Sequence, residues 1–237
     1  SEKLVLRFGD GKTAETIAMP FAGSRVPARK LASSLFARAR RLSPLRVLRN
    51  LRLRDVASRL RDRLGAPKAL VSVCLSTQVG CAIGCGFCFT GTKGLVRNLT
   101  AGEIVAQVLA LGPEVGVGGI VFMGMGEPLH NLDATLRALS ILRDEAGLGI
   151  RGDRIHVSTS GLVPAIDALA EASDVRLALS LHATTDAVRS RIVPPNDRYP
   201  IAALLDACRR YVARARGPIM IEYVLLSGVN DSPDDAR

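Results

Sequence analysis

Tryptophan is absent from this 237-residue chain, and aromatic residues make up only 4% of it. Proteins that bind single-stranded nucleic acid by base stacking need several aromatic side chains on one surface, so this composition does not favour that class of site. There is also no run of eighteen or more apolar residues, and we therefore expect no membrane-spanning helix. The opening residues Ser1-Glu2-Lys3 show no signal-peptide pattern.

Cysteine is scarce too, with five in the chain, and three of these fall within eight residues. A small secreted protein stabilised by disulfides would carry a more dispersed set, so the sequence does not indicate that class. We therefore expect the protein in a reducing cytoplasm. The length is sufficient for a substantial core, either as one large domain or as a domain with an appendage.

Acidic residues are nearly absent from residues 25–68, where 14 Lys and Arg stand against only Asp55 and Asp62. The net charge of this segment, +12, exceeds the +10 of the whole chain, so the other residues sum to −2. Leucines at helical spacing indicate a basic helical segment, and its charge favours a polyanionic partner such as RNA. The alternative is a solvated helix face whose apolar stripe packs on the main domain.

The rest of the chain predicts an α/β fold. Residues 1–24 indicate a β-hairpin turning at Gly9-Asp10-Gly11. From residue 69 onward, strand and helix patterns alternate, with strands expected at 70–76, 119–123, 154–159, 175–181 and 219–226, and a last helix beginning at Ser232-Pro233. Such units predict a partial parallel (β/α) barrel with five strands present and a sixth missing. We divide the chain into the hairpin (1–24), a basic helical insertion (25–68) and the partial barrel (69–237).

The stretch from Cys81 to Cys88 places three cysteines at the spacing C-x3-C-x2-C, in a glycine-interrupted loop after the first barrel strand. Thiolates bind soft metals, and an iron–sulfur cube normally takes four of them. Cys81, Cys85 and Cys88 would therefore leave one iron open to a small molecule. A zinc site would need a fourth ligand, for which only Cys74 is near in sequence. Three unrelated structural thiols are the remaining alternative.

This spacing, with Phe87 just before the last cysteine, resembles the signature of the radical S-adenosylmethionine (radical SAM) enzymes. The resemblance implies a [4Fe-4S] cluster that reduces SAM to methionine and a 5′-deoxyadenosyl radical. Gly126-Glu127-Pro128 resembles the GEP element of that family, in which the glutamate and nearby backbone hold the amino group of SAM. A buried carboxylate facing an ammonium group is a physically sound arrangement.

Between Val73 and Asp231 the chain resembles the RlmN/Cfr-like branch of the family, which methylates an adenine carbon in 23S rRNA. The motifs that carry the resemblance are residues 74–81 (CLSTQVGC), 97–99 (RNL), 123–129 (MGMGEPL), 158–161 (STSG), 180–183 (SLHA), 192–194 (IVP) and 222–225 (EYVL). By this resemblance, Cys81, Cys85 and Cys88 hold the cluster. The residues implied to contact SAM are Gly126, Glu127, Ser158, Ser180, Leu181 and His182.

Three single residues have both a functional and a structural interpretation. Cys74 matches the cysteine with which the family resolves a covalent enzyme–RNA intermediate, although free cysteines are most often small core residues. His182 could be a hydrogen-bonded histidine at a strand end, but its neighbours favour the SAM site. Cys208, on a predicted helix with apolar neighbours, is expected in the core.

The chain departs from the family pattern in three places. It ends at Arg237, before a sixth strand, and no cysteine follows Cys208, whereas the family carries its methyl group on a cysteine near the C-terminus. The family's helical accessory domain has no counterpart. Where the family has Ile-Pro-Glu, with the glutamate as proton acceptor, this chain has Met19-Pro20-Phe21. Glu15 and Glu222 are carboxylates that could substitute. We expect either a fragment of a longer protein or a shortened relative with altered activity.

The resemblance implies a radical SAM RNA methyltransferase that modifies C2 of an adenine in 23S rRNA, with tRNA as a further substrate; a C8 enzyme is the close variant. It would need an electron donor such as flavodoxin or ferredoxin, and we expect a monomer that does not bind membranes. A radical SAM enzyme of different reaction is one alternative. A non-catalytic RNA-binding relative is another, although the complete cysteine triad, Glu127 and His182 argue against it.

Overall fold

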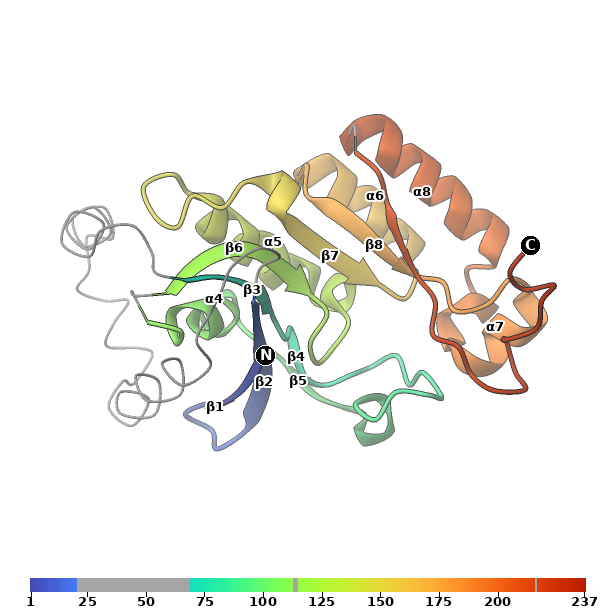
Figure 1. The fold of residues 1–237 in the computed structure, drawn as a ribbon, viewed down its shortest axis with the longest axis horizontal. Helices are drawn as coiled ribbons and strands as arrows, with labels where there is room; N and C mark the ends of the chain where they lie inside the picture. The colour runs from blue at the N-terminus through green and yellow to red at the C-terminus, as the bar shows by residue number, and fades with distance from the viewer. Residues whose placement is uncertain (21–68, 113–114, 216) are drawn as a thin grey trace.

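The computed structural model describes residues 1–20, 69–112, 115–215 and 217–237 (Figure 1). Its main feature is a seven-stranded sheet. The strands of this sheet, in chain order, are β1 (Glu2–Arg7), β2 (Thr13–Pro20), β3 (Ala69–Cys74), β6 (Val115–Phe122), β7 (Ile155–Thr159), β8 (Arg176–Ser180) and β9 (Met220–Glu222). They lie side by side in the order β1-β2-β3-β6-β7-β8-β9, and the last five are mutually parallel.

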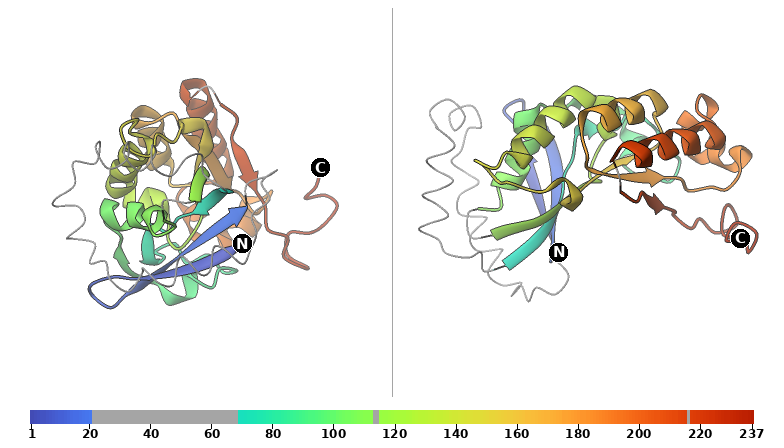
Figure 2. Two further views of the ribbon diagram at one scale, coloured as in Figure 1. Left: turned by 60° about the vertical axis from the view of Figure 1, so that its left-hand side comes forward. Right: turned by 90° about the horizontal axis from the view of Figure 1, so that it is seen from above.

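The predicted α/β fold with a partial parallel barrel is confirmed. The strand order is linear, so the described strands form an open sheet and not a closed barrel, and the views in Figure 2 show its curvature. The five parallel strands are the five expected from the sequence. The last of them is shorter than expected, because β9 ends at Glu222 and residues 223–226 follow as a loop.

The N-terminal hairpin is also confirmed, and it extends the sheet. β1 and β2 pair antiparallel, and β2 then pairs antiparallel with β3, with Ile17 opposite Cys74. The tight turn is closed by the amide of Phe8, which donates to the carbonyl of Lys12 at 2.8 Å. Alternate residues of β2, including Ala14 and Ala18, are buried, so the hairpin adds its own apolar face to the core.

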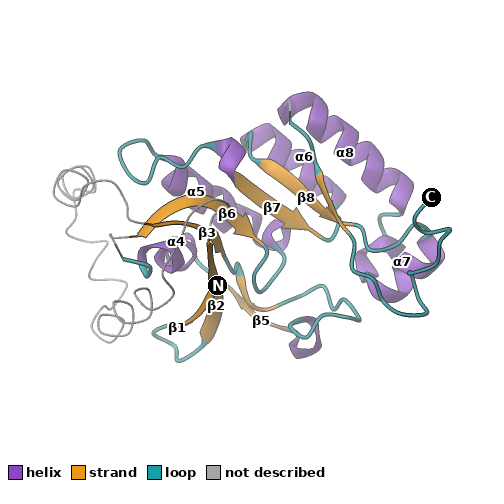
Figure 3. Cartoon of the chain, in the orientation of Figure 1, coloured by secondary structure: helices purple, strands orange, loops and turns teal. Residues whose placement is uncertain are grey.

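Five helices accompany the parallel strands in the described part of the chain: α4 (Ala101–Leu109), α5 (Leu132–Arg143), α6 (Val163–Ala172), α7 (Asp186–Ile192) and α8 (Ile201–Ala215). The predicted capping box opens α4, because the Thr100 hydroxyl accepts from the amide of Glu103 and the Glu103 carboxylate accepts from that of Thr100. Helices α4, α5, α6 and α8 form one layer over one side of the sheet (Figures 2 and 3).

The two faces of the parallel sheet differ in chemistry because successive side chains of a strand point to opposite sides. One face, which we call the helix-covered face, carries the buried apolar side chains of the strands. They pack against Ile104, Leu139, Ile166 and Leu204 of the four helices. The other, which we call the open face, carries Cys74, Val121, His156, Ser158, Ser180 and Glu222, as strand register and alternation place them on the same side.

Short elements complete the description. β4 (Gln78–Gly80) and β5 (Leu95–Asn98) form a separate two-stranded sheet, which the sequence analysis did not predict. Single 3-10 turns are η1 (Gly91–Lys93), η2 (Pro128–Asn131), η3 (Gly152–Arg154) and η4 (Pro194–Asp197). The helix expected after Ser232 is wrong, since residues 232–236 form only successive turns. The basic segment 25–68 lies outside the described residues. None of the helices in the described ranges is long and apolar enough to cross a membrane.

Candidate functional site

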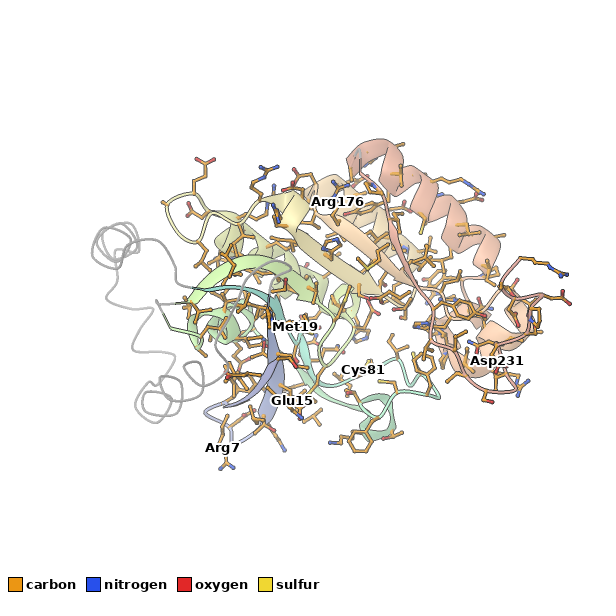
Figure 4. The ribbon with its side chains drawn as sticks, viewed as in Figure 1. Arg7, Glu15, Met19, Cys81, Arg176 and Asp231 are labelled. Carbon is orange, nitrogen blue, oxygen red and sulfur yellow. The ribbon has the colours of Figure 1, made fainter. Side chains whose placement is uncertain are left out.

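The three clustered cysteines lie in the loop that β4 and β5 close at its base. The amide of Cys81 donates to the carbonyl of Gly94 at 3.0 Å, and that of Cys88 to the carbonyl of Cys85 at 3.0 Å. At the far side of the loop, the amide of Gly86 donates to the carbonyl of Ile192 in α7 at 3.0 Å. These backbone bonds fix the loop beside the carboxyl ends of the parallel strands, with Cys81 near the sheet (Figure 4).

The three thiols are free, partly exposed and close enough to influence one another. Burial raises the pKa of Cys85 to about 12, and the charges of Cys81, Cys88 and Glu127 add to that shift. Burial also raises the pKa of Cys81, with smaller contributions from Glu127 and Cys88. Such mutual repulsion makes three thiolates costly here without a cationic ligand between them.

The donor set of this loop fits an iron–sulfur cluster better than a zinc ion. Within the described ranges, no three His, Cys, Asp or Glu side chains are arranged around one point as a single metal ion requires. Zinc would need four such donors around itself, whereas each thiolate of a cluster binds a different iron atom. Three soft ligands on one loop, with no other donor residue between Cys81 and Cys88, match the cluster.

Glu127 is held at the end of the loop that follows β6. Its Oε2 accepts from the amide and the hydroxyl of Ser160, at 2.8 and 2.9 Å, and its Oε1 accepts from the amide of Leu129 at 3.1 Å. Burial raises the pKa of Glu127, and the hydrogen bonds from Ser160 and Leu129 oppose that shift. Gly126 has φ +100°, and a Cβ on it would lie 2.5 Å from the Cβ of Gln78, so this position requires glycine.

Three side chains of the open face meet at the carboxyl ends of β7, β8 and β9. The hydroxyls of Ser158 and Ser180 each donate to Oε2 of Glu222, at 3.0 Å, and the two hydroxyl oxygens are 3.3 Å apart. A main-chain hydrogen bond also joins the ends of β8 and β9 here, because the amide of Leu181 donates to the carbonyl of Glu222 at 3.0 Å. Ser158 and Ser180 were expected in the site from sequence, and Glu222 was named only as a substitute carboxylate.

His182 lies next to this group and contacts the cysteine loop. Its backbone has φ +59°, the one positive value among the described non-glycine residues. Its Nδ1 accepts from the amide of Val224 at 3.1 Å, and its ring meets that of Phe87 edge to face, with centroids 4.9 Å apart. Burial lowers the pKa of His182, so the neutral ring is favoured. Phe87 thus packs the cysteine loop against the strand end that carries His182.

Two buried polar residues that sequence reasoning missed hold these strand ends in place. The amide nitrogen of Asn230 donates to the carbonyls of His182 at 2.6 Å and Val224 at 2.8 Å. Arg189 of α7 is fully buried, and its guanidinium donates to the carbonyls of Ser160 at 2.7 Å, Ser180 at 3.1 Å and Leu181 at 2.9 Å. A lone asparagine or arginine in a polar stretch gives no sequence signal of such a role.

Cys74 lies at the end of β3, buried on the open face, where Thr16 of the hairpin donates its hydroxyl to the Cys74 carbonyl. Burial raises the pKa of the Cys74 thiol, and the charge of Glu222 adds to the shift. Glu15, the other substitute carboxylate, is instead partly exposed on β2 and paired with Lys3 at 2.7 Å. Cys208 is buried in the helix layer, as expected. Phe21 lies outside the described ranges.

All the sequence-predicted site residues are therefore gathered on one rim. Cys81, Cys85 and Cys88 are on a loop fixed to α7, and Glu127 follows β6. Ser158 and Ser180 lie at the carboxyl ends of β7 and β8, and His182 follows β8. The carboxyl ends of parallel strands are where barrel enzymes carry their chemistry. The rim offers soft thiols, a buried carboxylate, hydroxyls and a neutral imidazole, which together can hold a metal cluster and a small ligand with several polar groups.

Comparison with known proteins gives consistent results. Residues 75–236 match the family model of the radical SAM superfamily. Dual-specificity RNA methyltransferase RlmN of Geobacter sulfurreducens is 57% identical over 166 residues, which are 70% of this chain and 46% of that protein. The protein of the same name from Xanthomonas oryzae pv. oryzae is 47% identical over 176 residues, covering 44% of its length. The chain thus spans about half the length of these curated relatives.

One solved structure extends the likeness to the whole described fold. It is a radical SAM methyltransferase from Sphaerobacter thermophilus, with 42% sequence identity and a TM-score of 0.76. The match covers 99% of this chain and 57% of that one. At 42% identity, the two chains are similar in sequence as well as in architecture.

Proposed function

Because the chain belongs to the radical SAM superfamily, we propose that it is the radical SAM core of an RNA methyltransferase that methylates C2 of an adenine in 23S rRNA and also acts on tRNA. The observation that carries the proposal is the shared rim, where three loop cysteines adjoin Glu127, Ser158, Ser180 and His182. Support for the substrate comes from relatives named dual-specificity RNA methyltransferases, with 47–57% identity.

In this proposal the cofactors are a [4Fe-4S] cluster and SAM. Cys81, Cys85 and Cys88 would hold the cluster, and the chemistry that the cluster would supply is the one-electron reduction of SAM that the methylation needs. Glu127, fixed by Ser160 and Leu129, has an acceptor site left for the ammonium group of SAM. Gly126 permits the close turn that brings Glu127 to the rim. The other proposed SAM contacts are Ser158, Ser180, Leu181 and His182.

Cys74 takes the role of releasing the product from a covalent enzyme–RNA intermediate. Its position supports this role, since it ends the strand that leads into the cysteine loop and faces Glu222 across the open face. Its raised pKa keeps it protonated at neutral pH, so the thiol needs a proton acceptor before it can act as a nucleophile. The family's methyl-carrying cysteine has no counterpart in these 237 residues, since none follows Cys208.

The cellular setting follows from the same chemistry. A cluster that supplies electrons needs a donor, and we propose flavodoxin or ferredoxin in a reducing cytoplasm, with the enzyme as a monomer. The basic segment 25–68, with a net charge of +12, would contact RNA phosphates. Charge reversal of arginines between Arg38 and Arg63 should then weaken RNA binding and reduce its salt dependence. Unchanged binding would count against a role for the segment.

The test of the proposed function uses the full-length natural protein, loaded anaerobically with iron and sulfide and supplied with reductant, SAM and a 23S rRNA transcript. We expect 5′-deoxyadenosine to form and the RNA to gain 2-methyladenosine, both measured by mass spectrometry. Cys85→Ala should abolish both products. Cys208→Ala, which changes a buried cysteine outside the site, is the matched control and should retain them.

Two other results would reject the proposal in distinguishable ways. SAM cleavage without RNA methylation would leave a radical SAM enzyme of different reaction. If the loaded protein bound RNA but formed no 5′-deoxyadenosine, the chain would be a non-catalytic RNA-binding relative. The intact mass of the natural protein should be measured alongside, since a value above 25.2 kDa means that further residues belong to the enzyme.

A further inference from the structure

The meeting point of Ser158, Ser180 and Glu222 has a specific geometry that neither the sequence motifs nor the comparisons assign. Both hydroxyls converge on a single carboxylate oxygen, Oε2, each at 3.0 Å. The three residues come from three different strands, with Ser180 directly opposite Glu222 in the β8–β9 register. We propose that Glu222 is a positioning residue for the cofactor: it fixes both serine hydroxyls as hydrogen-bond acceptors toward SAM.

The direction of the two serine hydroxyl protons follows from which groups can donate a hydrogen bond and which can only accept one. Each serine has one hydroxyl proton and two lone pairs, while a carboxylate only accepts. A hydrogen bond from a hydroxyl to a carboxylate is stronger than one between two hydroxyls. Both protons therefore point at Oε2 of Glu222, and not across the 3.3 Å between the two serine oxygens. The lone pairs of Ser158 and Ser180 are then left for an incoming donor. Without Glu222 each hydroxyl would be free to rotate and donate instead.

The chemistry of the ligand follows from this arrangement. Two oriented acceptors beside a negative charge suit a group that donates hydrogen bonds, either an ammonium or a hydroxyl, and SAM carries both. The site is accessible, because Ser180 and Glu222 are only partly buried. The second carboxylate oxygen of Glu222, Oε1, has no hydrogen-bond partner within the described ranges, so the carboxylate is not saturated by the protein.

Other groups around Glu222 are consistent with a ligand site and not only with a structural link. The titratable side chains that feel its charge are Cys74, His156 and His182, which come from β3, β7 and the end of β8. Burial lowers the pKa of both histidines, so they are neutral near pH 7. No Lys or Arg within the described ranges forms an ion pair with Glu222, in contrast to Glu15 and Glu171, which pair with Lys3 and Arg214. The Glu222 carboxylate therefore has no competing cation of the protein among the described residues and stays available to accept from both serine hydroxyls.

The inference rests on the proposed function, and the test separates the two. Equilibrium dialysis with labelled SAM is carried out on the full-length protein with its cluster reconstituted, for wild type, Glu222→Gln and Glu171→Gln. We expect Glu222→Gln to weaken SAM binding about 10- to 100-fold, since a hydrogen-bonded charge is lost. Glu171→Gln, the same change on an exposed glutamate of α6, should bind as wild type.

A double-mutant cycle then decides whether Glu222 acts through the serines. In a Ser158→Ala, Ser180→Ala background, Glu222→Gln should have little further effect, because the hydroxyls that it orients are gone. Fully additive losses, or unchanged SAM binding by Glu222→Gln with a folded circular dichroism spectrum, would overturn the inference. If wild type itself bound no SAM, the proposed function would fail instead. Glu222→Asp, which keeps the charge, should recover part of the affinity.

Discussion

The two faces of the parallel sheet are built from the same strands but carry different kinds of side chain. On the helix-covered face, residues such as Phe122 and Leu177 are fully buried among apolar helix side chains. On the open face, the alternate residues of the same strands include the Cys74 thiol, the His156 imidazole, the Ser158 and Ser180 hydroxyls and the Glu222 carboxylate. The difference indicates that stability is concentrated on one face, so that the other is free to carry charges and partly exposed polar groups that a core would not tolerate.

The sharpest test of that division is a pair of truncations on adjacent strands. Phe122→Ala removes a buried ring from the helix-covered face of β6 and should lower the free energy of unfolding by about 3 to 5 kcal/mol. Ser158→Ala, on the open face of β7, removes one hydroxyl donor and should cost about 1 kcal/mol or less. Urea denaturation followed by circular dichroism gives both values. Comparable losses for the two variants would mean that the open face also carries the stability.

Arg189 connects helix α7 to the strand ends that carry the candidate site. Its replacement should have the next largest effect on the free energy of unfolding. Its guanidinium donates to three strand-end carbonyls, so Arg189→Met leaves those acceptors buried without a donor. We expect a loss of about 2 to 4 kcal/mol in urea denaturation. Arg189→Lys should recover only part, because an ammonium cannot reproduce the planar fork. Full recovery by lysine would show that charge matters here and geometry does not.

The helix-covered face is also what made the fold predictable. Apolar runs such as those around Val73, Ile120 and Leu177 recur with helical stretches between them, and this alternation predicts parallel strands without further information. The pairing of β2 with β3 was not predictable, because the two strands are separated by residues 21–68 and the register depends on contacts such as Thr16 with Cys74. The short strands β4 and β5 were missed because they contain glycine and polar residues in a loop-like stretch.

The candidate site was predictable only in part. The cysteine spacing and the Gly126-Glu127-Pro128 motif are local in sequence, so Cys81, Cys85, Cys88 and Glu127 could be named as candidate site residues without a structure. Glu222 and Asn230 could not, because their roles depend on partners more than 40 residues away, such as Ser180 and His182. A polar residue at a strand end has many possible partners, and the sequence does not say which of them the sheet brings within hydrogen-bonding distance.

Glu127, in the loop after β6, allows the candidate site to be tested by the pH dependence of stability. Burial raises its pKa in the folded state, so the folded protein binds this proton more tightly than the unfolded chain does. The free energy of unfolding should therefore fall as pH rises from about 4.3, the ordinary carboxyl value, toward the folded pKa. Glu127→Gln cannot titrate and should lose this part of the slope. Parallel pH profiles of the two proteins, measured by urea denaturation, would show that Glu127 is not perturbed.

The smallest expected effect compares two buried thiols, one on each side of the sheet. Burial raises the pKa of both Cys74, on the open face, and Cys208, in the helix layer, where it reaches about 11, so both should alkylate slowly at pH 8. Only Cys74 feels the charge of Glu222, which raises its pKa further. Glu222→Gln should therefore lower the pKa of Cys74 and speed its alkylation about two- to threefold. Peptide-resolved mass spectrometry measures both cysteines in one sample, and an equal increase at Cys208 would indicate general loosening of the fold and not the loss of a neighbouring charge.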